Sequence, residues 1–237
     1  MSEKSKEKVV IVTLVLLAVF VIVSTIGAII MISSDSRNKE AVGKSVHLLA
    51  VGDSITFGED ENKKSYADYM AEHNNWIKLD KISWGGLNIK DLRRLVTTHA
   101  YDMVQDVDVV TVLIGANDFG FDMPIEEFES EMDKYMKEIK GLYPNSRIVF
   151  LTPLYRDYFG TTIKTMGGTV NNLGVTLYQY GDVIKRCGAA NGIEVIDLTT
   201  DEYLGAGNIR ELTSDGLHPN KAGNEMIADK LVIALGL

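Results

Sequence analysis

The sequence predicts an α/β domain in which a parallel β-sheet is covered on both sides by helices. Short apolar segments typical of buried strands recur along the chain, at residues 46–51, 77–82, 107–114, 148–151 and 193–198. Between several of them, apolar residues recur with the period of a helix that buries one face. Alternation of strands and helices is the pattern of a parallel sheet with helical connections.

A separate segment precedes this domain. Residues 9–32 contain no charged side chain, and at about 1.5 Å per residue they are long enough to cross a bilayer core of about 30 Å. We therefore expect a short amino-terminal tail at 1–8, a transmembrane signal-anchor helix at 9–32, a polar linker at 33–44 and a folded domain at 45–237. A cleaved signal peptide is the alternative, but its apolar region is usually shorter and ends at a small-residue cleavage site.

The charges that flank residues 9–32 do not fix the orientation of the anchor. Three lysines precede it and three basic residues follow it, namely Lys4, Lys6 and Lys8 against Arg37, Lys39 and Lys44. The positive-inside rule therefore gives a tie.

Two helices are expected between the later strands, and a third at the end of the chain. Their apolar stripes are Phe128, Met132, Tyr135, Met136 and Ile139, then Leu173, Leu177, Tyr180, Ile184 and Cys187. Pro219 suits the first turn of the final helix, whose Gly223, Ile227, Leu231 and Ala234 are expected to face the sheet. We interpret these stripes as core, without a functional role.

Composition excludes some classes of function. The chain has 237 residues, of which 46% are hydrophobic, and a net charge of −9 that lies after residue 40. Such a domain repels nucleic acid, so we expect no nucleic-acid partner. Cys187 is the single cysteine, so no intrachain disulfide can form. His47, His73 and His99 show no metal-ligand spacing, and we predict neither a metal site nor a cofactor.

Polar motifs follow the predicted strands, where open α/β sheets bind ligands. They are Gly52-Asp53-Ser54, Gly85-Gly86, Gly115-Ala-Asn117-Asp118 and, before the last helix, Asp215-Gly-Leu-His218. A serine hydroxyl is a weak nucleophile unless a base removes its proton. An aspartate three residues before a histidine can hold the imidazole through Nδ1 and leave Nε2 to face Ser54. These residues therefore predict a Ser-His-Asp triad.

The same four motifs, in this order, resemble the SGNH or GDSL hydrolase family over residues 45–237. The resemblance implies a flavodoxin-like three-layer α/β/α fold with a five-stranded parallel sheet and the activity of a serine esterase. It implies Ser54 as nucleophile, His218 as base and Asp215 as the residue that orients it. The oxyanion hole would consist of the backbone N–H groups of Ser54 and Gly86 and the side-chain amide of Asn117.

The register of the glycine motif comes from the family pattern. Asp91 lies five residues beyond Gly86, as an aspartate does in many family members, whereas Gly85 stands where many of them have serine. Thr56, where a glycine would complete Gly-x-Ser-x-Gly, separates this chain from the α/β-hydrolase elbow.

Each motif also has a structural interpretation. Ser54 or Asp215 could cap a helix, and Asn117-Asp118 could form a turn. A binding module is another alternative, in which residues 54–58 cradle the phosphate of a flavin, although this leaves Asp215 and His218 unexplained.

The substrate is inferred from the longest irregular segment, residues 153–169, which follows a strand and is expected to lie over the site. In it, Tyr155, Tyr158 and Phe159 could stack on a sugar ring, Arg156 and Asp157 could bind its hydroxyls, and Gly167-Gly168 could form a hinge. Without a separate apolar lid, we expect removal of short acyl groups, most simply acetyl, from a glycan near the membrane. A lysophospholipase, a short-chain lipase and a carbohydrate acyltransferase are the alternatives.

The family resemblance favours a domain outside the cytoplasm, held at the cell membrane by a single span. No oligomeric state is predicted.

Overall fold

The computed structural model describes residues 45–237 except 61, 158–169 and 201. The predicted tail, membrane span and linker, residues 1–44, lie outside the described residues. Among the helices that are described, none is both long enough and apolar enough to cross a membrane.

A parallel sheet of five strands forms the centre of the domain. The strands are β1 (Val46–Gly52), β2 (Ile77–Ser83), β3 (Val109–Leu113), β4 (Arg147–Leu151) and β5 (Glu194–Ile196), in the spatial order β2-β1-β3-β4-β5. All neighbouring pairs are parallel. The predicted parallel α/β architecture is confirmed, and β3 and β5 are shorter than their apolar segments, whose end residues lie outside the strands.

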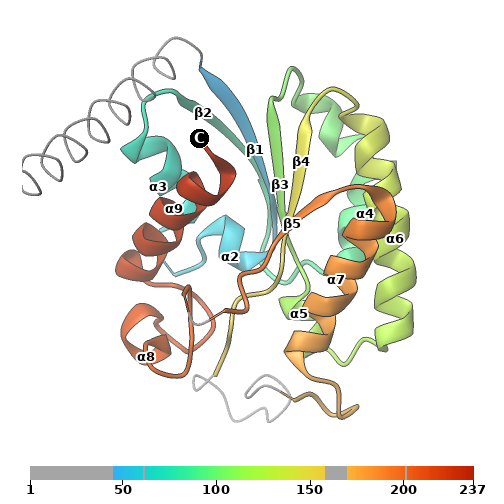
Figure 1. Ribbon diagram of the computed structural model, residues 1–237, viewed down its shortest axis with the longest axis vertical. Coiled ribbons are helices and arrows are strands. Elements are labelled where there is room, and N and C mark those ends of the chain that lie inside the picture. Colours follow the sequence, from blue (N-terminus) through green and yellow to red (C-terminus); the bar gives the residue numbers. More distant parts are fainter. Residues whose placement is uncertain (1–44, 61, 158–169, 201) are drawn as a thin grey trace, which may run out of the picture. The chain divides into compact units, whose positions relative to one another are not determined.

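Helices cover both faces of the sheet (Figure 1). On one face lie α4 (Ile89–Thr97), α6 (Ile125–Leu142) and α7 (Leu177–Asn191), and on the other lie α3 (Tyr66–His73) and α9 (Lys221–Leu235). The shorter elements are α2 (Ser54–Phe57), the 3₁₀ helix η1 (Ala100–Met103), α5 (Ala116–Gly120) and α8 (Ile209–Leu212). Each layer of helices buries its own apolar cluster against the sheet, as a three-layer fold requires.

The apolar stripe predicted for α6 is buried in full, whereas α7 begins later than its stripe suggested. Thr176 and Gln179 form a capping box that starts α7 at Leu177. Leu173 lies before the helix, in a turn that the Asn171 side chain holds through the N–H groups of residues 173 and 175, and it is exposed. The prediction that Leu173 belongs to this helix is therefore wrong.

The final helix also differs in detail from its prediction. Asn220 caps α9, with its side chain accepting from the N–H of Gly223, so Pro219 precedes the helix. Gly223, Ile227 and Leu231 are buried as expected, but Ala234 is exposed and Leu235 is buried instead. In the last turn of α9, Leu235 and not Ala234 therefore faces the core.

The strand order places three loops side by side. β1 pairs with β2 on one side and with β3 on the other, and Gly52 at its end lies level with Ser83 and Leu113. This is the point where strand order reverses, at which α/β folds bind ligands. Gly52 permits the ends of β1 and β3 to lie close together, because a Cβ on residue 52 would lie 2.5 Å from the carbonyl oxygen of Leu113.

Candidate active site

The turn from β1 to α2 presents Ser54 at the end of the sheet. Asp53 has an extended backbone and caps α2 by accepting a hydrogen bond from the N–H of Ile55 at 3.0 Å. Capping is therefore the role of Asp53, and the Ser54 hydroxyl is left for another partner. Its Oγ lies 2.9 Å from Nε2 of His218.

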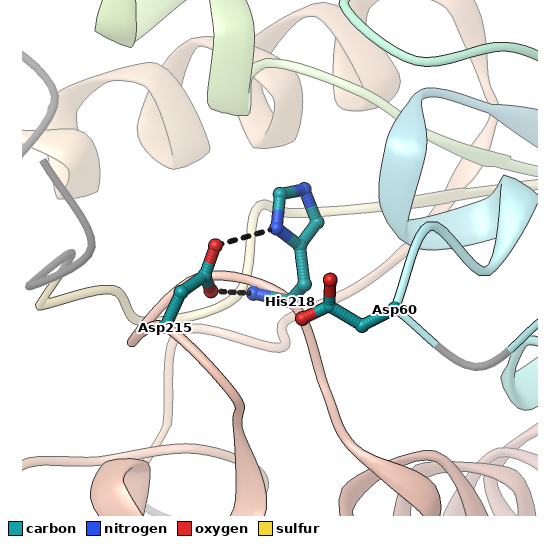
Figure 2. Close-up of side chains that lie close together, drawn as sticks. All are labelled: Asp60, Asp215 and His218. Atoms are coloured by element: carbon teal, nitrogen blue, oxygen red, sulfur yellow. Dashed lines mark hydrogen bonds and ion pairs between the residues drawn. The ribbon is translucent and has the colours of Figure 1, made fainter.

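Asp215 holds His218 through the backbone and through the ring. One carboxylate oxygen accepts from the N–H groups of Leu217 and His218 at 2.9 and 2.8 Å, and the other lies 2.8 Å from Nδ1 of the imidazole (Figure 2). The helix cap proposed as the alternative for Asp215 is instead Asn220. The structure thus brings the three predicted triad residues together in the order Asp215, His218, Ser54.

The charges around His218 suit its role as a general base. Burial lowers the pKa of His218, but the hydrogen bond and charge of Asp215, with smaller contributions from Asp60 and Asp53, raise it above its usual value. Burial raises the pKa of Asp215, and its hydrogen bonds to His218 outweigh that effect and hold the pKa below its usual value. Asp215 therefore stays ionised where His218 exchanges its proton.

Three groups at or near Ser54 could donate hydrogen bonds to an oxyanion. As the first residue of α2, Ser54 has an N–H without a carbonyl partner in the helix. Gly86 has a φ of +78°, a conformation that side chains rarely adopt, and it lines the same pocket. The Asn117 amide donates one hydrogen to the carbonyl oxygen of Leu87 at 2.8 Å, which leaves its second N–H for a ligand.

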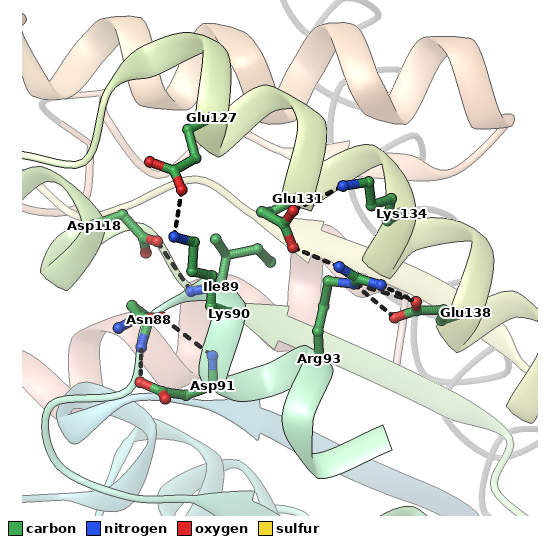
Figure 3. Close-up of polar contacts among 10 residues, drawn as sticks. All are labelled: Asn88, Ile89, Lys90, Asp91, Arg93, Asp118, Glu127, Glu131, Lys134 and Glu138. Carbon is green, nitrogen blue, oxygen red and sulfur yellow. Dashed lines mark hydrogen bonds and ion pairs between the residues drawn. The ribbon is translucent and has the colours of Figure 1, made fainter. Parts of the chain in front are cut away.

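Two adjacent side chains tie the loops after β2 and β3 together. Asn117 bonds Leu87, and Asp118 accepts from the N–H of Ile89 at 3.0 Å (Figure 3). Between these points, Asn88 caps α4 in a capping box with Asp91. Asp91, which the sequence analysis used only to set the register, thus starts the helix that follows Gly86.

Ion pairs hold α4 against α6 behind these loops. The Arg93 guanidinium contacts Glu131 at 2.5 Å and Glu138 at 2.6 Å (Figure 3). Several charge-assisted bonds from one side chain fix orientation well.

The sequence analysis gave no role of their own to two motif residues whose carboxyl groups are buried. Asp53 and Asp118 are 1% and 0% exposed. Burial raises the pKa of Asp53 to about 6 and that of Asp118 to about 7. Each belongs to a motif at the end of an apolar strand, and that placement is the signal that could have indicated their burial and raised pKa.

The described first residues of the long loop pack against the rest of the domain. Arg156 is 1% exposed, donates to the carbonyl oxygen of Ala116 at 2.9 Å, and stacks near the ring of Phe119. The expectation that it binds sugar hydroxyls is wrong, because burial against α5 removes it from the surface. Tyr155 is partly buried against the apolar cluster that includes residues of α3 and α9, and the N–H of Asp157 donates to the carbonyl oxygen of Gly216, the residue after Asp215. Tyr158, Phe159, Gly167 and Gly168 lie outside the described residues.

An open pocket of about 360 Å³ leads to the nucleophile. Its described lining consists of Ser54, Glu59, Gly85, Gly86, Asn117, Phe121, Leu217 and His218. The sequence analysis did not select Glu59, Phe121 or Leu217, since loop residues carry no periodic signal. The arrangement can attack a carbonyl carbon with Ser54 and bind the resulting oxyanion.

One described group has the composition of a metal site. Asp60, Asp215 and His218 present ligand atoms within 4.8 Å of one another (Figure 2). Both ring nitrogens of His218 already have partners, Asp215 and Ser54, so we interpret this group as part of a hydrogen-bonded triad. His47, His73 and His99 each contact a different carboxylate.

Comparison with known proteins connects this geometry to a family. The sequence profile of the GDSL-like lipase/acylhydrolase family matches residues 50–226. An isoamyl acetate-hydrolyzing esterase 1 homolog from Mus musculus is 23% identical over 128 residues, which is 50% of this chain and about half (51%) of that relative.

Solved structures share the fold. A protein from Lactobacillus plantarum superimposes with a TM-score of 0.70 at 22% identity, covering 81% of this chain and 97% of its own. An acetylxylan esterase from Geobacillus stearothermophilus gives 0.64 at 21% identity, covering 82% of this chain and 96% of its own.

Proposed function

Because this chain belongs to the GDSL-like lipase/acylhydrolase family, we propose that it hydrolyses carboxylic esters through an acyl-enzyme formed on Ser54. The observation that carries this proposal is the continuous contact from Asp215 to Nδ1 of His218 and from Nε2 to Oγ of Ser54, at 2.8 and 2.9 Å. A hydroxyl so placed can lose its proton as it attacks.

The reaction follows from this geometry. His218 takes the Ser54 proton while Oγ bonds to the ester carbonyl carbon, and Asp215 stabilises the imidazolium. The oxyanion accepts hydrogen bonds from the N–H groups of Ser54 and Gly86 and from the Asn117 amide. His218 then gives its proton to the departing alkoxide. A water molecule, deprotonated in turn by His218, attacks the acyl carbon and releases the acid and Ser54.

For the substrate we propose a short acyl ester, most simply acetyl, on a carbohydrate. The pocket is small, open and lined by polar groups as well as by Phe121 and Leu217, so it offers little apolar surface to a long chain. The relative with the same fold from Geobacillus stearothermophilus is an acetylxylan esterase, which supports this class.

For location we propose that residues 9–32 hold the domain at the outer side of the cell membrane. The support is their lack of charge over a length sufficient for a bilayer. The same placement beside lipid makes a lysophospholipase the second candidate.

The deciding experiment measures kcat/KM on 4-nitrophenyl esters of two to twelve carbons, then on acetylated xylo-oligosaccharides and on lysophosphatidylcholine. We expect efficiency to be highest at two to four carbons and to be lost in Ser54→Ala. Efficiency that climbs steadily beyond eight carbons would replace the carbohydrate proposal with the lipid one. Net formation of a new ester when a second sugar is added would indicate acyl transfer.

A further inference from the structure

One carboxylate in the pocket has no part in the reaction described above. Glu59 lies two residues after the end of α2, and its backbone N–H donates to the carbonyl oxygen of Ser54 at 3.1 Å. Its side chain lines the same pocket as Ser54, Asn117 and His218. Glu59 is therefore held next to the nucleophile by its backbone, and it is exposed in the wall of the pocket that a substrate enters.

The Glu59 side chain lies against Gly85. A Cβ built on Gly85 would come within 2.7 Å of Oε2 of Glu59, which is closer than a real carbon atom could remain. A side chain at position 85 would therefore displace the carboxylate. The glycine that departs from the family pattern at this position leaves room for Glu59 in the wall of the pocket.

The charge of Glu59 is not neutralised within the described part of the chain. Its carboxylate makes no hydrogen bond or ion pair with a described residue, and the described lining of the pocket contains no lysine or arginine. The nearby lysines have other contacts: Lys64 pairs with Glu72, Lys81 pairs with Asp68, and Lys63 lies over the ring of Phe57. The carboxylate is thus available to a ligand.

A second carboxylate lies near the catalytic histidine. Asp60 is exposed and its carboxylate lies beside the ring of His218 (Figure 2). A carboxylate only accepts hydrogen bonds, and it repels another anion. Together these properties favour hydroxyl groups and disfavour phosphate or carboxylate groups near Ser54.

We infer that Glu59 selects the alcohol part of the substrate: it accepts a hydrogen bond from a free hydroxyl of a neutral polyol or sugar ester and excludes esters whose alcohol part carries negative charge. This inference rests on the proposed function and narrows it. It predicts that the substrates are neutral acylated polyols. Acylated uronates and acyl glycerol phosphates are predicted to be poor substrates.

The test compares glycerol 1-acetate with 1-acetylglycerol 3-phosphate, which carries a phosphate group on the 3-hydroxyl of the same alcohol. The measured quantity is the ratio of kcat/KM for the neutral ester to that for the phosphate, at low ionic strength. We expect the wild-type ratio to favour the neutral ester, and Glu59→Gln to lower it by about tenfold, because it removes the repulsion of a dianion at close range. Added salt should lower the wild-type ratio too.

Two further variants make the test specific. Gly85→Ser should lower the ratio in the same direction, since its side chain moves the Glu59 carboxylate out of the wall. Glu126→Gln, an exposed glutamate on α6 that does not line this pocket, should leave the ratio and the activity unchanged. Thermal unfolding of each variant checks that the fold is intact.

The outcomes separate this inference from the proposed function. A ratio in Glu59→Gln within twofold of wild type, or an equal change in Glu126→Gln, would overturn the role of Glu59 while esterase activity remains. A wild-type protein that hydrolyses neither glycerol 1-acetate nor 4-nitrophenyl acetate would refute the proposed function itself.

Discussion

Replacing Asn117 by alanine tests the oxyanion hole most directly. The substitution removes one of three proposed donors from a site whose Ser54 and Asn117 are each only 8% exposed. Loss of one such donor from a preorganised site costs about 2.7–4 kcal/mol in the transition state, or about 10²–10³ in kcat. Because the ground-state carbonyl is held less strongly than the oxyanion, KM should change little.

The same change also removes the hydrogen bond from Asn117 to Leu87. That bond contributes about 1 kcal/mol to folding, which for a domain of this size lowers Tm by about 2–4 °C. Asn74→Ala is the matched control, because the Asn74 amide donates to the carbonyl oxygen of Met70 at 2.9 Å on α3, away from the site. It should show a similar loss of Tm with normal kcat.

The assay is steady-state hydrolysis of 4-nitrophenyl acetate alongside thermal unfolding. A fall in kcat/KM that comes wholly from KM would show that Asn117 only binds substrate. Equal losses of kcat in Asn117→Ala and Asn74→Ala would show that destabilisation, and not the missing donor, is responsible.

Three further predictions concern the triad, the buried carboxyl group and the topology. Asp215→Asn should lower kcat by about 10⁴, since it favours the wrong imidazole tautomer. Because Asp215 raises the pKa of His218, the substitution should also shift the acid limb of the kcat/KM profile to lower pH. Near-normal activity would indicate a Ser-His dyad. Asp118 has a pKa raised by burial from 3.8 to about 7, so the folded state binds its proton more tightly and the free energy of unfolding should fall as pH rises from about 4 to 7. Asp118→Asn keeps an acceptor for the N–H of Ile89 but cannot ionise, so urea unfolding across this range should show a shallower decline; an unchanged slope would contradict the assignment. Protease added to intact cells should release the domain if residues 9–32 anchor it outside, and full protection would reverse the proposed orientation.

The strands and the motif residues were predictable because their signals are local. An apolar run that ends in glycine identifies β1, and the short separation of Asp215 and His218 allows a direct contact. Arg156 and Glu59 show the limit of this approach. Arg156 is buried by Ala116 and Phe119, and Glu59 reaches the pocket wall beside Gly85. These contacts join different loops of the chain, so no local pattern reports them.

The predicted start of α7 was wrong for another reason. Leu173 fits the apolar period, but the Asn171 side chain offers the backbone a turn at the same place, and the capping box at Thr176 starts the helix at Leu177, four residues later. Competition between a turn and a helix is decided by side-chain hydrogen bonds, which hydrophobic periodicity does not detect.

The separation of the triad along the chain has a consequence for how activity appears and disappears. Ser54 and His218 lie 164 residues apart, and His218 is followed closely by α9, which packs against α3. During synthesis Ser54 is therefore made well before the base that is proposed to activate it. If Ser54 and His218 act together as proposed, activity requires α9 to be docked, and local detachment of α9 should abolish ester hydrolysis while the sheet is still folded.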